Sequence, residues 1–139
     1  MKKRLLYLVL PVITLILEII PYGAVCNFAH PATDGSIGHF RELYSYFDLI
    51  PFGYANFAPL ITGILTCFIF LLVLIYCVFG KKRVLSLAKW ILLICAITSL
   101  CPLILGIRFF SLVGALITVS IIGELVWILR FTNASQNDQ

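Results

Sequence analysis

Apolar residues in this chain are grouped into four long runs, with shorter polar stretches between them. A helix rises 1.5 Å per residue, so about 20 apolar residues cross the roughly 30 Å hydrocarbon core of a bilayer. The runs occupy residues 5–25, 57–79, 84–105 and 109–129. We therefore predict an all-α integral membrane protein, in which residues 1–130 form a single bundle of four transmembrane helices.

The third and fourth runs are almost continuous, and one helix over both would be far longer than a bilayer is thick. We expect the chain to fold back near Pro102, Gly106 and Arg108, because proline and glycine interrupt helices and arginine is drawn to water. Residues 131–139 are polar and are predicted to form a short cytoplasmic tail.

The first run follows a basic start, MKKR, which is one feature of a cleaved signal peptide. However, Glu18 and Pro21 interrupt the position where a cleavage region would lie. We therefore predict that residues 5–25 are retained as a membrane helix.

The segment 26–56, between the first two runs, is predicted to be an outer loop of about 30 residues. Within it, Phe40, Leu43 and Phe47 fall at helical spacing, which predicts a short amphipathic helix over about residues 39–49. Its aromatic side chains suit the lipid headgroup region. Two roles stay open for this helix: a lid or docking surface over the bundle, or an anchor that only covers the helix ends.

Composition agrees with a membrane location, since 62% of the residues are hydrophobic and only 12% are charged. Soluble domains carry about 25% charged residues. The net charge of +4 is explained by orientation, because cytoplasmic loops collect lysine and arginine. With the N-terminus inside, only Arg41 and Arg108 of the ten basic residues lie on the outer side. We predict a multi-pass protein of the cell membrane with both termini cytoplasmic, and no nucleic-acid partner.

Glu18 is an acid inside the first apolar run, and an intramembrane acid is a functional candidate by default. Thr62 and Thr66 of the second run are expected at a similar depth. We predict a candidate binding site formed by Glu18, Thr62 and Thr66. In it the carboxyl group accepts a hydrogen bond from a threonine or pairs with an outer-face arginine, Arg41 or Arg108.

Lys89 and Glu124 each lie roughly 8 Å from the expected cytoplasmic end of the third and fourth helices. These two helices are joined by a tight turn, so opposite charges at matched depth would lower each other's cost in lipid. We predict an ion pair between Lys89 and Glu124, with a lysine that reaches the headgroups alone as the alternative. Glu18 and Glu124 are expected at opposite depths, which argues against a two-carboxyl site.

The five cysteines include no Cys-x-x-Cys pair. Cys26 and Cys101 both fall near the outer surface, so a disulfide between them is geometrically possible. His39 and Glu42 would share one face of the loop helix, but their spacing matches no known metal site. We predict no metal and no cofactor.

The sequence contains no phosphate-binding loop, no nucleophile with an adjacent base and no metal pattern, so an enzyme is not expected. The leading interpretation is a non-catalytic interaction or accessory subunit. Its expected partners are the lipid bilayer and either another membrane protein or further copies of the same chain. The alternative is a small oligomeric transporter or channel that uses Glu18 as a proton or cation site.

Overall fold

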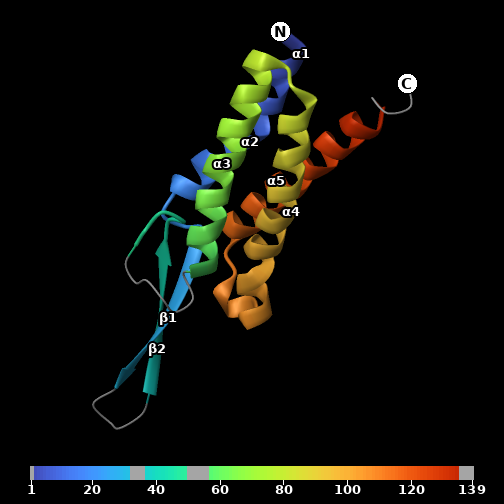
Figure 1. The fold of residues 1–139 in the computed structure, drawn as a ribbon. Helices are drawn as coiled ribbons and strands as arrows, with labels where there is room; N and C mark the ends of the chain where they lie inside the picture. Colours follow the sequence, from blue (N-terminus) through green and yellow to red (C-terminus); the bar gives the residue numbers. More distant parts are fainter. Residues whose placement is uncertain (1, 32–36, 50–56, 135–139) are drawn as a thin grey trace.

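The computed structural model describes residues 2–31, 37–49 and 57–134, and this part of the chain is mostly helical (Figure 1). It contains three long helices, each long and apolar enough to cross a membrane. These are α3 (Phe57–Phe79), α4 (Lys82–Leu105) and α5 (Leu112–Ala134). The range of α3 is the one expected from the sequence, whereas α5 begins and ends a few residues later than expected. The predicted tail therefore starts as helix, and residues 135–139 lie outside the described part.

The chain turns between α4 and α5 where the sequence predicts a break. Gly106 adopts a positive φ of 127°, which glycine tolerates because it has no Cβ. The short 3₁₀ helix η2 (Ile107–Phe109) follows and leads into α5.

The N-terminal helix is shorter than predicted and is divided into α1 (Lys2–Leu5), η1 (Leu6–Leu8) and α2 (Val9–Ile19). Pro11 has no N–H, so the carbonyl group four residues earlier lacks its helical donor, and the 3₁₀ turn lies at that point. The predicted end at residue 25 is wrong. Ile20 is already extended (φ −65°, ψ 131°), because the residue before Pro21 is disfavoured in a helix.

An antiparallel hairpin replaces the predicted amphipathic loop helix. Strand β1 (Ala24–Pro31) pairs with β2 (Ile37–Tyr44), and the rings of Phe28 and Phe40 stack across the strands at 5.3 Å. The prediction of a helix over 39–49, and with it an all-α fold, is therefore wrong. The reason is long-range pairing, because β1 supplies hydrogen-bond partners that the helical spacing within the loop does not reveal.

The base of the hairpin is fixed to the start of α5, while its far end extends beyond the helices (Figure 1). Ala24 forms an isolated β-bridge with Phe110. The Ser111 hydroxyl donates to the Gly23 carbonyl oxygen at 2.7 Å and accepts from the Gly114 N–H at 2.8 Å, so it also caps α5.

The opposite end of the bundle contains the N-terminus and the turn between α3 and α4 (Figure 1). Gly80 has a φ of 66°, and a Cβ at this residue would lie 2.5 Å from the Arg4 guanidinium. The same guanidinium lies 5.9 Å from the ring centre of Tyr76. Arg4 is thereby held next to the basic residues that begin α4.

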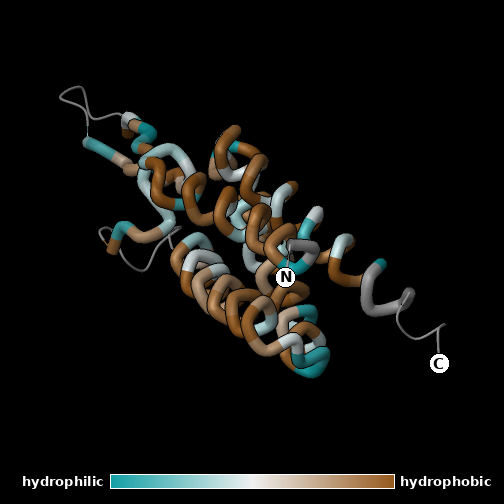
Figure 2. The backbone as a smooth tube through the Cα atoms, turned by 90° about the horizontal axis from the view of Figure 1, so that it is seen from above, coloured by the Kyte–Doolittle hydropathy of each residue, from teal (hydrophilic) through white to brown (hydrophobic). Residues whose placement is uncertain are grey.

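Hydrophobic residues run along most of each helix (Figure 2); some form a shared buried core, and others, such as Trp90 and Ile104, are exposed. Tyr7 makes edge-to-face contacts with Tyr76 at 5.8 Å and Trp127 at 6.4 Å, which join the N-terminal helix to α3 and α5. Fully buried residues include Ile69, Val73, Leu92, Ile117 and Ile121. The outward apolar surface is the kind that a hydrocarbon environment covers.

Candidate functional site

Glu18 lies in the last full turn of α2 and is completely buried. It shares the buried face of α2 with Pro11 and Thr14, which are spaced so that they lie on one side of a helix. The hydroxyl group of Thr66 in α3 donates a hydrogen bond to Glu18 Oε1 at 2.8 Å. The structure therefore brings together two of the three residues that the sequence placed in one site.

Thr62 lies one turn from Thr66, but no hydrogen bond joins its hydroxyl group to the acid. Its hydroxyl group lies 2.9 Å from that of Thr98 in α4 and 2.9 Å from the Ala58 carbonyl oxygen. The Thr66 hydroxyl group likewise lies 3.0 Å from the Thr62 carbonyl oxygen, so its single proton is shared between this acceptor and Glu18 Oε1. These bonds to the preceding turn let a threonine hydroxyl be satisfied inside an apolar bundle.

Two residues of α4 complete the polar cluster. The Sγ atom of Cys95 lies 3.6 Å from Thr66 Oγ1, and the Thr98 hydroxyl donates to the Cys95 carbonyl oxygen at 3.0 Å. Sequence reasoning missed the part played by Thr98. The signal for it was its position three residues after Cys95, which puts both residues on one helix face.

A second acid, Glu124 of α5, is also buried, with 3% of its surface exposed. Glu18 Oε2 and Glu124 Oε1 are both buried, and neither has a hydrogen-bond partner in the described part of the chain. A buried polar atom without a hydrogen-bond partner normally lowers the stability of the folded protein by about 1–3 kcal/mol.

The predicted ion pair between Lys89 and Glu124 is not formed in this structure. The Lys89 ammonium group lies 5.4 Å from the ring centre of its neighbour Trp90, where a cation–π contact is favourable. A long lysine side chain can follow an apolar surface towards water, whereas Glu124 is turned into the bundle. A similar depth in the membrane was therefore not enough to predict an ion pair, because the two residues lie on different faces of adjacent helices.

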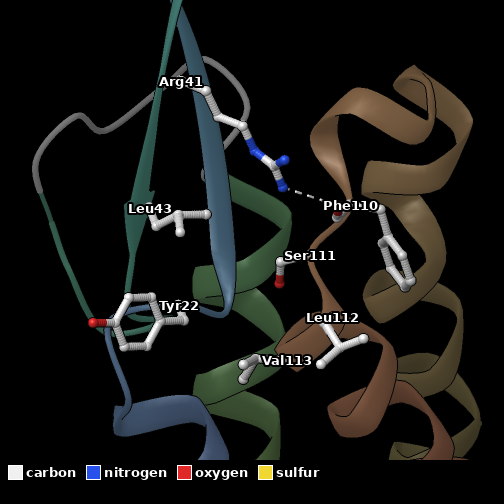
Figure 3. Close-up of a pocket in the computed structure, with 7 residues that line it drawn as sticks. All are labelled: Tyr22, Arg41, Leu43, Phe110, Ser111, Leu112 and Val113. Atoms are coloured by element: carbon white, nitrogen blue, oxygen red, sulfur yellow. Dashed lines mark hydrogen bonds between the residues drawn. The ribbon is translucent and has the colours of Figure 1, made fainter.

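Arg41 and Arg108, the arginines that the sequence predicts on the outer side, lie near the hairpin base, and neither is hydrogen-bonded to Glu18. Arg41 Nη2 donates to the Phe110 carbonyl oxygen at 3.4 Å, and Asn27 Nδ2 donates to the Arg108 carbonyl oxygen at 3.4 Å. Figure 3 shows Arg41 beside an open pocket of about 490 Å³ between the hairpin and the start of α5. The pocket is lined by Tyr22, Arg41, Leu43 and residues 110–113.

All five cysteines are free, so the disulfide that the sequence left possible between Cys26 and Cys101 is not formed. Cys26 is buried in β1, opposite Glu42 of β2, and Cys101 lies in α4. Burial, together with the nearby Glu42 charge, raises the pKa of the Cys26 thiol. Within the described residues, no group of three or more histidine, cysteine or acidic side chains is arranged to hold a metal ion.

No protein-family model, curated protein or solved structure matches this chain. Any functional proposal therefore depends on the geometry described above.

Proposed function

We propose that this is a multi-pass cell-membrane protein with four crossings. Helices α3, α4 and α5 supply three of them. The helical segment of residues 2–19 supplies the fourth, because 18 residues at 1.5 Å each extend about 27 Å. This is close to the thickness of the hydrocarbon core.

Both termini lie in the cytoplasm and the hairpin lies outside in this proposal. Basic residues support this orientation, since Arg4 lies beside the turn that carries residues 81–83, Lys-Lys-Arg. This end of the bundle is opposite the hairpin (Figure 1). Lysine and arginine are enriched on the cytoplasmic side of membrane proteins.

The biochemical role we propose is that of a non-catalytic interaction or accessory subunit, which presents the hairpin to another membrane protein or to a second copy of this chain. One observation carries this proposal. Strand β2 is exposed over almost its whole length, including Ile37 (70%) and Phe40 (47%). An exposed strand edge offers unpaired N–H and C=O groups, to which an extended segment of a partner can add as a further strand.

Substitutions at the exposed face of β2 test this role. Ile37→Lys should abolish co-purification of the partner or the self-association seen by cross-linking in native membranes. Ile104 in α4 is also exposed (83%) but lies on a helix face, so Ile104→Lys is the matched control and should leave the association intact. Loss of association only in the control variant, or in neither, would reject the hairpin as the interaction element.

The unpartnered oxygen of Glu18 favours a second candidate, a small oligomeric transporter or channel in which Glu18 binds a proton or cation. Reconstitution into vesicles with a pH-sensitive dye inside tests it. Glu18→Gln should abolish ion flux while leaving thermal stability nearly unchanged. Equal ion flux in wild type and in Glu18→Gln would exclude Glu18 as the transport site.

A further inference from the structure

The positions of Glu18 and Glu124 relative to one another follow from how α2 and α5 pack. Tyr7 contacts Trp127 at one end, and Gly23 is hydrogen-bonded to Ser111 at the other, so the two segments run antiparallel. Glu124 precedes Trp127 by three residues and so faces α2 about one turn beyond Tyr7. Glu18 lies about two turns further along, which is roughly 10 Å at 1.5 Å per residue.

Groups from every neighbouring element face this region, and none of those identified is cationic. Thr66 faces Glu18 from α3, and Cys95 of α4 lies 3.6 Å from the same Thr66 hydroxyl group. The Tyr46 N–H, from the segment after β2, donates to the Glu18 carbonyl oxygen at 2.9 Å. Among the described residues, no lysine or arginine forms an ion pair with either carboxyl group, since Arg4 and Lys89 are directed at the rings of Tyr76 and Trp90.

We propose that Glu18 and Glu124 form one coupled proton-binding site in the interior of the bundle. Two ionised carboxylates there would lose their hydration and also repel each other. A proton on one of them removes the repulsion and most of the desolvation penalty. Each carboxyl group keeps one oxygen without a partner, Oε2 of Glu18 and Oε1 of Glu124, and these are the atoms available to carry the proton.

The residue between the two acids also suits a proton site. Thr14 is completely buried on the same face of α2, one turn from Glu18 in the direction of Glu124. Its hydroxyl group donates to the Leu10 carbonyl oxygen at 3.0 Å and can still accept a hydrogen bond. The two carboxyl groups therefore titrate as a pair, and each one's proton affinity depends on the charge of the other.

This inference deepens the second candidate function by naming Glu124 as the second carboxyl group and the proton as the ligand. It rests on the same buried acid, but it does not require transport. Proton binding is measured below without any flux, so a failed flux assay and a failed proton site are distinguishable.

Infrared titration of the full-length protein in detergent tests the proposal. The carboxylic-acid C=O band of wild type at neutral pH should lose intensity in both Glu18→Gln and Glu124→Gln. At about 10 Å and an effective dielectric constant of about 20, the repulsion corresponds to roughly a tenfold change in proton affinity. The carboxyl group left in each single variant should therefore bind its proton about tenfold more weakly than the wild-type pair binds its first proton.

Glu42→Gln is the matched control, because Glu42 is an exposed acid of β2 that accepts a hydrogen bond from Tyr44. It should leave the buried acids' band and titration unchanged. The coupled site is rejected if neither glutamine variant loses the protonated carboxyl band. It is also rejected if the remaining acid binds its proton as tightly as the wild-type pair binds its first proton. Each single variant measures the effect of one carboxyl group on the proton affinity of the other. One folded single variant is therefore enough for the measurement.

Discussion

Thr66→Val removes the one hydrogen bond that holds the carboxyl group of Glu18. Valine has nearly the shape of threonine, so the substitution opens no cavity, and the lost hydroxyl group is the main change. Glu18 Oε2 already lacks a partner, and the variant would leave Oε1 without one as well.

The expected loss is about 1–1.5 kcal/mol of unfolding free energy. An orphaned buried polar group costs about 1–3 kcal/mol, and hydrogen bonds between membrane helices measure on average about 0.6 and at most about 1.7 kcal/mol. The loss should lie in the upper part of the range for hydrogen bonds between membrane helices, because the other oxygen of the Glu18 carboxyl group has no partner among the described residues.

The assay is reversible unfolding in mixed micelles of mild detergent and dodecyl sulfate, followed by helical circular dichroism. Thr62→Val is the control on the same helix. Its hydroxyl group bonds to Thr98 and Ala58, and Thr98 keeps its bond to the Cys95 carbonyl oxygen, so no acid loses a partner. We expect a loss below about 0.5 kcal/mol there. Equal losses in the two variants would refute the special role of the Thr66–Glu18 bond.

Two further predictions concern the ends of the bundle. Gly80→Ala should destabilise the protein by about 1–2 kcal/mol, because the φ of Gly80 is positive and a Cβ there would meet the Arg4 guanidinium. Gly123→Ala is the control, because Gly123 lies in α5 with no atom within 4 Å of its Cβ position. This change should be neutral or stabilising by up to about 1 kcal/mol. Thermal unfolding compares the two, and equal effects would contradict the close approach of Arg4. Cys26 should react slowly with maleimide at pH 7 and faster as the pH rises, because burial raises the pKa of its thiol, while a cysteine placed at the exposed residue His39 should react at once. Mass spectrometry measures the rate of maleimide labelling at each position. Equal labelling rates at residues 26 and 39 would show that β1 is not packed as described.

The long helices could be predicted because their information is local. Run length and hydropathy determine where α3, α4 and α5 lie, and Gly106 marks the turn by its own conformational freedom. The Glu18–Thr66 contact was also within reach, since it needed only two polar residues at similar depth on neighbouring helices.

The hairpin and the orientations of Lys89 and Glu124 could not be predicted in the same way. Residues 37–44 are compatible with a helix until β1 is available as a partner, and that choice depends on partners that lie 6 to 20 residues earlier in the chain. Lys89 and Glu124 were matched by depth, but the rotation of a helix about its axis decides which residues meet. A nearly uniform apolar surface leaves that rotation undetermined in the sequence.

The four-crossing arrangement is tested most directly by labelling single introduced cysteines in intact cells with a membrane-impermeant maleimide. A cysteine at His39, in the exposed hairpin strand, should be labelled from outside above the wild-type background. A cysteine at Lys81, in the turn between α3 and α4, should be labelled only after the membrane is permeabilised. Labelling of residue 81 from outside, or protection of residue 39, would contradict the proposed arrangement in the membrane.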